Sequence, residues 1–413
     1  MLRHYLLTCW AVYRRRKMFT AINLLCIVLT LVVLLVAAAL FDFMVRPPGS
    51  GANDDRLLQV PVMTWIGRDG HSRLQAPLGY RTIEHHLRPL RTVERVAAVS
   101  QPQSVTVQQA SGTQAMLMRR VDADYWSILD FRLLSGRLPD RDDAAQGRMV
   151  AVLSATAAAR LFPGRDPVNR KIEASGQTFS IVGVVRDSSH SHGFADIWAP
   201  VTTYPSTEYR HQASGNFTAL LLVRRGIPLS EVRAEVEASA QRFVFDDPSR
   251  WERAVFWADT QLDAVARNLL GQTDTPEPDT AVLVAGLVVA SLAFMLMPAL
   301  NLVNLNVGRI LERSVEIGVR KSFGATDGQL ALQFVVENIL LCLVGGAISL
   351  GGAWLVLAWL ERSDLIPYFT AAINPAVFGY AVAASSVFGL LSGVIPAWRM
   401  ARLDPVHALR GVA

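Results

Sequence analysis

Two short clusters contain the residue types that bind metal ions or move protons. They are Asp187, His190 and His192 in the run DSSHSHGFAD, and the consecutive residues Glu84, His85 and His86. Imidazole and carboxylate groups at short spacing can hold zinc, but neither cluster has a defined zinc spacing. We therefore expect both clusters to lie on loop or helix surfaces, and we predict no metal site and no cofactor bound by this chain.

The sequence also offers no catalytic arrangement. No Ser/His/Asp or Cys/His combination stands out, and Cys26 and Cys342 lie in long apolar runs. The 413 residues contain no G-x-x-x-x-G-K-S/T run, the loop that cradles nucleotide phosphates. We assign no catalytic residue, and we expect any ATP, with its Mg²⁺, to be bound and hydrolysed by a partner protein.

The composition indicates a membrane protein, because 51% of the residues are hydrophobic and only 18% are charged. Four apolar stretches contain a single charged residue, Glu337. They are residues 19–41, 281–305, 330–360 and 376–398. Each can cross the ~30 Å hydrocarbon core of a bilayer at ~1.5 Å per helical residue. We predict a polytopic α-helical membrane protein with four transmembrane helices and a large α/β extracytoplasmic domain between helices 1 and 2.

The basic residues predict the orientation of these helices. Three short segments beside the apolar stretches, 1–18, 306–329 and 399–413, hold 12 of the 40 Lys and Arg residues. By the positive-inside rule these segments and both termini face the cytoplasm, whereas residues 42–280 and the short 361–375 loop face outward. The net charge of +5 therefore reflects membrane topology and gives no reason to expect nucleic-acid binding. The first segment, 1–18, has the spacing of an amphipathic helix.

The 42–280 segment contains no cysteine and has a mixed α/β pattern. We predict a membrane-proximal α/β lobe at about 55–112 and 216–265, with an inserted lobe at about 113–210. The strongest expected strands are Leu57–Trp65, Ala97–Val107, Met149–Leu153, Phe179–Val185 and Phe217–Val223, and the expected helices are Tyr80–Leu87, Ala155–Leu161 and Leu229–Phe243. The run TDTPEPD at Thr273–Asp279 predicts a linker into the second span.

The segment between spans two and three has the pattern of an amphipathic helix. Apolar residues recur every four positions at Leu311, Val315 and Val319, and Gly324 can end the helix. Such a helix can lie on the membrane surface, or it can dock in a groove of a partner. The residues alone do not separate these two interpretations.

Polar and small residues inside the spans suggest helix packing. Asn301 and Asn304 near the inner end of span two can form hydrogen bonds between helices, and Glu337 can anchor span three or take part in coupling. In span four, Ser385, Gly389 and Gly393 recur every four residues. This spacing allows close helix approach, either within the chain or in a dimer.

Several motifs together resemble those of the MacB-like and FtsX-like permease family. The run ERSVEIGVRKSFGAT at 312–326 resembles the family signature ER..EIG.RKA.GA, although Phe323 stands where a smaller residue is common. The tail IPAWRMARLDPVHALR at 395–410 resembles the ending PA..AA.LDP..ALR. Further matches are Gln333 with Glu337, Gly345-Gly346, and the segments 135–137, 150–154, 159–162 and 179–185. They follow one another in the family's order over most of the chain.

The resemblance implies an ABC transporter permease in the bacterial inner membrane that relays ATP-driven motion to its outer domain. It implies a helix that couples to the ATPase, at Arg313, Glu316, Ile317, Gly318, Arg320, Lys321, Gly324 and Ala325. Some members carry a fused N-terminal ATPase; because this chain begins almost at its first span, we expect a separate ATPase subunit. A second permease copy or paralogue would complete a homo- or heterodimer, and a periplasmic adaptor with an outer-membrane duct would be further partners.

Two functions remain open within this family. The first is export or extraction of an amphiphilic substrate such as a peptide, antibiotic, siderophore or lipoprotein. The alternative is FtsX-like signalling to a cell-wall hydrolase or a sensor kinase without transport.

Overall fold

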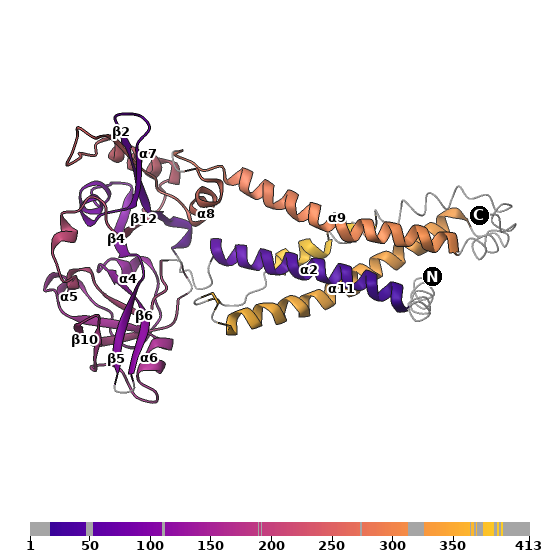
Figure 1. Ribbon diagram of the computed structural model, residues 1–413, viewed down its shortest axis with the longest axis horizontal. Coiled ribbons are helices and arrows are strands. Elements are labelled where there is room, and N and C mark those ends of the chain that lie inside the picture. Colours follow the sequence, from indigo (N-terminus) through magenta and orange to yellow (C-terminus); the bar gives the residue numbers. More distant parts are fainter. Residues whose placement is uncertain are drawn as a thin grey trace. The chain divides into compact units, whose positions relative to one another are not determined.

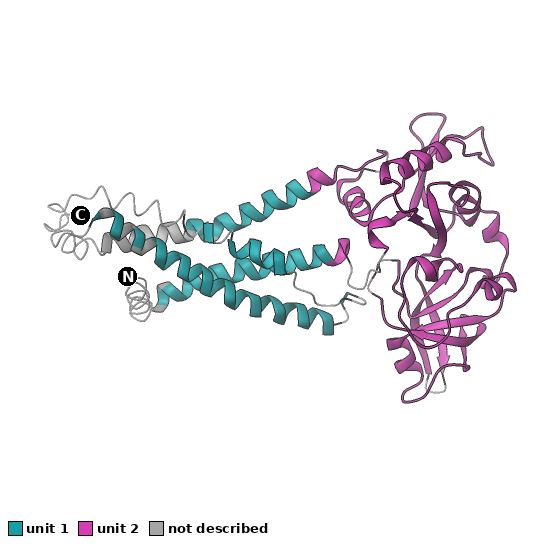
Figure 2. Ribbon diagram, turned by 180° about the vertical axis from the view of Figure 1, so that it is seen from behind, with its two compact units in different colours: residues 1–42, 284–413 teal, residues 43–283 magenta. Residues whose placement is uncertain are grey.

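A computed structural model of the chain forms two compact units, each described here by itself. The helical unit comprises residues 1–42 and 284–413, and the large domain comprises residues 43–283 (Figure 2). The structure describes residues 17–46, 53–109, 112–188, 190, 192–272, 275–312, 326–363, 365–366, 369, 375–383, 386–387 and 390.

The large domain is built on a ten-stranded sheet, part of which closes on itself (Figure 1). In spatial order the strands are β1 (Leu57–Val60), β12 (Phe217–Val223), β4 (Val93–Ser100), β6 (Gly112–Val121), β11 (Ile197–Pro200), β8 (Val150–Ser154), β10 (Gln177–Val185), β9 (Lys171–Ala174) and β5 (Gln103–Gln109), with β7 (Leu133–Gly136) beside β10. Because β5 pairs with both β9 and β6, six strands form a closed ring. Closure leaves these strands without the exposed edges of an open sheet.

The interior of this ring is apolar because alternate residues of its strands point inward. On β9, Ile172 and Ala174 are buried and the two residues between and before them are exposed, the period-2 pattern of a half-buried strand. Phe179 and Ile181 of the neighbouring β10 are fully buried in the same cluster. Helix α6 (Ala155–Leu161) covers it, with its N-terminus capped by the Ser154 hydroxyl.

A second core lies where β1, β12 and β4 extend the sheet beyond the ring. All seven residues of β12 are buried. Helix α7 (Leu229–Gln241) and the turn formed by α3 (Tyr80–Thr82) and the π-helix η2 (Ile83–Leu87) contribute to this core, as does a three-stranded sheet. That sheet contains β13 (Trp251–Phe256), β2 (Val62–Gly67) and β3 (Arg73–Pro77). Shorter helices are η1 (Asp54–Arg56), α4 (Tyr125–Ile128), α5 (Arg141–Ala145), η3 (Val201–Thr203) and η4 (Glu208–Arg210).

Two of the expected strands are divided in the structure, and proline explains both divisions. The stretch Leu57–Trp65 breaks at Pro61 into β1 and β2, which belong to different sheets. The stretch Ala97–Val107 breaks at Pro102 into β4 and β5. Proline has no amide N–H to donate to a strand ladder, so it interrupts the pairing. The other expected strands and helices of this segment are present with their limits shifted by three residues at most.

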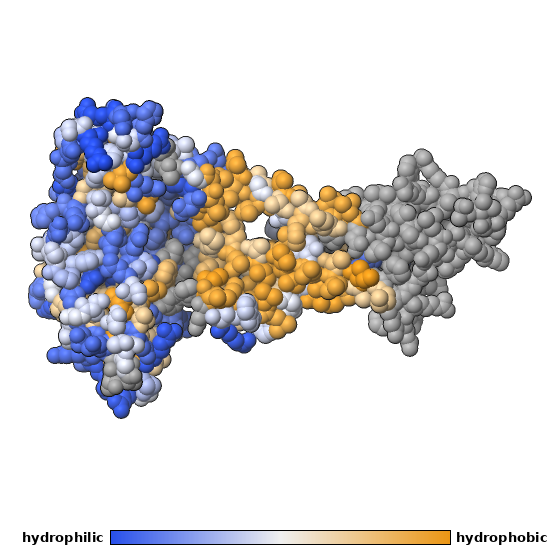
Figure 3. Space-filling view, viewed as in Figure 1, coloured by the Kyte–Doolittle hydropathy of each residue, from blue (hydrophilic) through white to orange (hydrophobic). Residues whose placement is uncertain are grey.

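The helical unit contains three long apolar helices in its described part. They are α2 (Lys17–Val45), α9 (Thr280–Glu312) and α11 (Asp327–Arg362). Each has a stretch long and apolar enough to cross a membrane, and their described surfaces are mostly hydrophobic (Figure 3). Of the fourth expected span, 376–398, the structure describes 376–383 and three later residues, all helical, so the count of four spans is not shown.

Helices α2 and α11 pack closely where α11 has glycine. A stripe on α2 with four-residue spacing is buried, comprising Asn23, Ile27, Leu31, Leu35 and Ala39. A Cβ added at Gly345 of α11 would lie 2.7 Å from Ile27 Cγ2, and one at Gly352 would lie 2.9 Å from Val32 Cγ2. These distances are too short for real contacts, so the two glycines allow the helices to approach.

This packing predicts different effects for two glycines of the same helix. We expect Gly345→Ala to destabilise the solubilised protein by about 1 kcal/mol, because the new methyl group meets Ile27. Gly351→Ala is the matched control, since a Cβ there meets nothing within 4 Å. Thermal unfolding in detergent measures both, and equal melting temperatures for the two variants would contradict the packing.

Candidate functional site

The predicted site residues fall mostly outside the described part of the chain. The predicted coupling-helix residues Arg313, Glu316, Ile317, Gly318, Arg320, Lys321, Gly324 and Ala325 lie outside it, and so do Ser385, Gly389 and Gly393. Asn301 and Asn304 lie on α9, where the structure describes the helix but not their side chains. Glu337 lies on α11 and is buried, as is its neighbour Asn338. Glu337 is therefore the one predicted site residue whose side chain lies within the described part of the chain.

A site that the sequence did not predict surrounds α8 (Gln261–Leu270) in the large domain. Helix α8 begins with a capping box, in which the Thr260 hydroxyl and the Asp263 carboxylate each accept a backbone N–H of the other residue. It ends at Gly271, whose φ of 67° is the left-handed conformation that glycine adopts readily. Between these fixed ends, α8 contacts both segments through which the large domain joins the apolar helices. We call this region the α8 junction.

The first connection is the end of α2. The side-chain amide of Gln261 donates a hydrogen bond of 2.9 Å to the backbone carbonyl of Met44, in the last turn of α2. The same amide accepts a 3.0 Å hydrogen bond from Gln59 of β1. Because each glutamine amide both donates and accepts, the orientations of both side chains are fixed.

The hydrogen bonds continue from β1 toward the centre of the large domain. Gln59 Oε1 lies against His192 Nε2, and the backbone carbonyl of His192 accepts a 2.8 Å hydrogen bond from the Tyr125 hydroxyl. That hydroxyl accepts a 3.2 Å bond from the indole of Trp198, a fully buried residue of β11. A continuous chain of hydrogen bonds thus runs from the last turn of α2 to a strand of the ring.

The second connection is the segment that leads into α9, and Arg267 holds it. The Arg267 guanidinium forms two 2.8 Å hydrogen bonds to the carboxylate of Asp259, and both side chains are buried. It also donates to the backbone carbonyls of Gln272 and Thr275 at 2.7 Å and of Pro276 at 3.3 Å. The Arg267 side chain therefore connects Asp259, just before α8, with the linker segment that follows α8.

Further polar contacts fix the same linker. Arg233 of α7 pairs with Asp263 of α8 and, at 3.1 Å, with Glu277 of the linker. Gln272 and Asp279 exchange two hydrogen bonds of 3.0 and 2.8 Å just before α9 begins. The described part of the Thr273–Asp279 linker is therefore held by the large domain.

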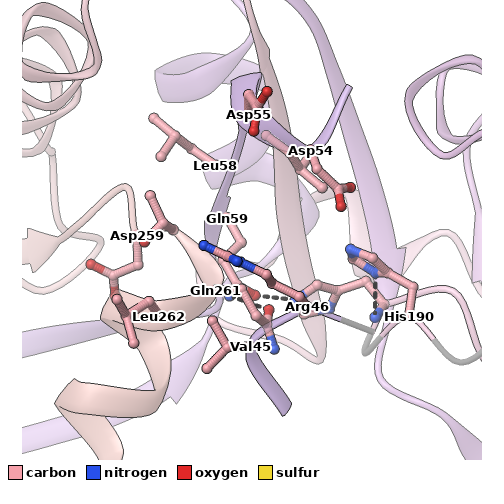
Figure 4. A pocket seen from close by; sticks show the side chains of 13 residues that line it. Val45, Arg46, Asp54, Asp55, Leu58, Gln59, His190, Asp259, Gln261 and Leu262 are labelled. Atoms are coloured by element: carbon pink, nitrogen blue, oxygen red, sulfur yellow. Dashed lines mark hydrogen bonds between the residues drawn. The ribbon is translucent and has the colours of Figure 1, made fainter. Parts of the chain in front are cut away.

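A pocket of about 400 Å³ lies beside this network (Figure 4). Its lining includes Arg46 just after α2, Asp54 of η1, and residues of β1 and α8. His190 also lines the pocket and is only 6% exposed, so the prediction of a surface loop is wrong for this residue. Among the described residues, no group of three or more His, Cys, Asp and Glu is arranged to hold a metal ion.

Burial controls the protonation of the two histidines. Desolvation lowers the pKa of His190 to about 4; nearby Asp54 opposes this shift and Arg119 adds to it. Desolvation also lowers the pKa of His192 well below its ordinary value, with smaller contributions from His190 and Arg119. Both side chains are therefore neutral at pH 7. Desolvation raises the pKa of Asp259, and the hydrogen bonds from Arg267 oppose that rise.

No local sequence signal could have identified this junction. Gln59 and Gln261 are separated by 202 positions, and Gln261 and Met44 by 217. Glutamine has no spacing rule comparable to that of metal ligands. The sequence offered one hint, the opposite charges of Asp259 and Arg267, which both lie shortly before the predicted linker Thr273–Asp279.

Comparisons with known proteins identify related chains. A family model described as the MacB-like periplasmic core domain matches residues 20–239, which is more than half of the chain. A second, the FtsX-like permease C-terminal model, matches residues 288–405.

Curated relatives include proteins named macrolide export ATP-binding/permease protein MacB. The one from Chromobacterium violaceum is 27% identical over 292 residues, covering 70% of this chain and 42% of the relative. The one from Agrobacterium fabrum is 28% identical over 319 residues, covering 74% and 45%. The chain thus spans less than half the length of these relatives.

Solved structures give weaker similarities. The periplasmic region of MacB from Actinobacillus actinomycetemcomitans is 14% identical, covers 56% of this chain and 98% of that structure, and gives a TM-score of 0.38. A permease-protein domain from Porphyromonas gingivalis is 16% identical, covers 50% and 90%, and gives a TM-score of 0.40.

Proposed function

The chain belongs to the MacB-like and FtsX-like ABC transporter permease family, and we propose that it converts ATP hydrolysis by a separate ATPase subunit into motion of its large domain. The ATP and Mg²⁺ bind to that ATPase, because the 413 residues contain no phosphate-binding loop of the Walker type. The motion serves export or extraction of an amphiphilic substrate. The macrolide export named for the relatives supports this class of substrate.

The α8 junction is the observation that carries this proposal. The chain enters the large domain after α2 and leaves it before α9, and α8 is hydrogen-bonded to both connections. A displacement of either helix end therefore acts on the same short helix. From α8 the displacement reaches the ring through Gln59 and His192. These contacts are hydrogen bonds and an ion pair within a closely packed domain. Because such a domain deforms little, a displacement of a helix end moves α8 and the residues bonded to it.

The membrane arrangement that we propose has four spans, with residues 376–398 as the fourth. Both termini and the 306–329 segment face the cytoplasm, and the large domain faces the periplasm with residues 113–210 as its inserted lobe. The charge asymmetry of the sequence supports this orientation. A second permease copy or paralogue completes the transporter, and a periplasmic adaptor with an outer-membrane duct receives the exported molecule.

The coupling segment provides the test of this proposal. We expect Glu316→Lys and Gly318→Trp to reduce recovery of the ATPase with the tagged chain by at least tenfold, because they reverse a charge and add bulk on a docking helix. Asp364→Lys, a charge reversal in the outer 361–375 loop, is the control and should leave ATPase recovery unchanged. Co-purification from native membranes with mass spectrometry measures this recovery. Normal recovery with both coupling variants would refute the docking role.

A further inference from the structure

A second pocket of the large domain contains a buried cation without a counter-ion. This open pocket of about 550 Å³ lies on the ring, between β5, the end of β6 and the turn from β9 to β10. Arg120 of β6 lines it and is only 7% exposed. The other polar lining groups are neutral amides and hydroxyls, from Gln103, Ser104, Ser175, Gln177 and Tyr204. A pocket of this volume can hold a small organic molecule.

The contacts of Arg120 leave part of its guanidinium unsatisfied. Nη2 donates a 2.8 Å hydrogen bond to Gln177 Oε1, and the guanidinium carbon lies 4.4 Å from the centre of the Tyr204 ring. Nε is buried and has no hydrogen-bond partner among the described residues. No described carboxylate forms an ion pair with Arg120. A buried charge that is only partly paired is costly, and a ring contact compensates for little of that cost.

The neighbouring Arg119 differs from Arg120 because backbone carbonyls accept hydrogen bonds from its guanidinium. Arg119 is also buried, but it donates at 2.8 Å to the backbone carbonyl of Phe194 and at 2.9 Å to that of Ser100. The orientation of the Gln177 side-chain amide is set by Thr203. The amide nitrogen donates a hydrogen bond to the Thr203 carbonyl, so the amide oxygen faces Arg120. Arg120 has no such pair of carbonyl partners among the described residues, and its side chain lines the open pocket together with Gln177 and Tyr204.

We propose that this pocket binds a molecule carrying an oxyanion, a carboxylate or a phosphate, with Arg120 as its counter-ion. An oxyanion accepts hydrogen bonds from a guanidinium in a planar, charge-assisted arrangement. The hydroxyls of Ser104 and Ser175 are additional donors at the rim, where both residues are exposed. No acidic residue lines the pocket to repel the anion. The site does not depend on the ATP-driven motion proposed above, so the two proposals can fail separately.

The test measures binding of four small probes to the purified full chain by isothermal titration calorimetry. The probes are N-acetyl-alanyl-alanine, its C-terminal amide, phenyl phosphate and phenol. We expect at least one of the two anions to bind at least tenfold more tightly than its neutral partner, and the preferred anion shows whether the natural ligand is a carboxylate or a phosphate. Equal binding of each anion and its neutral partner, or no binding by either anion, would overturn the proposal.

Substitutions then assign the binding to this pocket. Arg120→Met removes the charge and should weaken binding of the preferred anion at least tenfold, whereas Arg120→Lys should retain part of it. Ser104→Asp places a carboxylate in the pocket and should also abolish binding. Gln108→Asp is the control for Ser104→Asp and should leave binding unchanged, because Gln108 is exposed on the same strand but lies outside the pocket. Thermal unfolding checks that each variant is folded, and undiminished binding by folded Arg120→Met and Ser104→Asp variants would exclude this site.

Discussion

We expect the substitution Arg267→Met to lower the free energy of unfolding of the large domain by about 3–5 kcal/mol. The Arg267 side chain is 6% exposed and that of its partner Asp259 is 2% exposed, so the substitution leaves a buried carboxylate without its cation. It also removes the donor that holds three carbonyls of the segment before α9. Denaturant unfolding of the solubilised chain, followed by tryptophan fluorescence, measures the loss.

Two further variants show whether the ion pair causes this loss. Arg160→Met removes an exposed arginine at the end of α6 and should change stability by less than about 0.5 kcal/mol. In the double variant Asp259→Asn/Arg267→Met no buried charge remains, so we expect it to recover at least half of the loss. A double variant less stable than Arg267→Met would show that the unpaired carboxylate is not the cause.

Acidification should weaken the large domain through His190. Its pKa is about 4 in the folded state, against an ordinary value of 6.5. Because the unfolded chain binds the proton first as the pH falls, the stability contributed by the neutral histidine is complete above pH 6.5 and is lost as the pH falls toward 4. Relative to His190→Asn, the wild-type chain should lose about 2 kcal/mol between about pH 7 and pH 5.

The comparison with a variant is needed because other groups titrate in the same range. Burial raises the pKa of Asp122 to about 6, so this group makes the folded state more stable as the pH falls. His192 has a lowered pKa and acts in the same direction as His190. Both contributions are largely common to wild type and His190→Asn and cancel in the difference. His211→Asn, at an exposed site, is the control; if it reproduces the pH dependence of His190→Asn, the assignment to His190 is wrong.

The individual strands and helices were predictable from local sequence patterns, but the closure of six strands into a ring was not. The strand Phe217–Val223 and the helix Ala155–Leu161 have in the structure the limits that the sequence predicts. Pro61 and Pro102 divide two expected strands, and both prolines could have been read as breaks. The ring depends on β5 pairing with β9, more than 60 positions later, and no local pattern specifies such a partner.

The family could be predicted from the sequence, whereas the α8 junction could not. The motif at 312–326 and the tail at 395–410 indicated the permease family, and the family models confirm it. The interpretation of Glu337 as a structural anchor or a coupling group stays a prediction. The junction depends on glutamine amides and carbonyl groups brought together from distant segments, and these groups leave no periodic signal. His190 was expected on a surface because its cluster has no defined zinc spacing, yet the domain buries it.

Hydrogen–deuterium exchange on the permease purified with its ATPase tests the central claim most directly. The peptides to follow cover α8 and the described linker residues 275–279, with peptides of the ring as the second readout. Coupling through α8 predicts that exchange in both regions changes between the nucleotide-free complex and the complex trapped with a non-hydrolysable ATP analogue. An exchange pattern in the large domain that is identical in both states, in a complex that hydrolyses ATP, would contradict it.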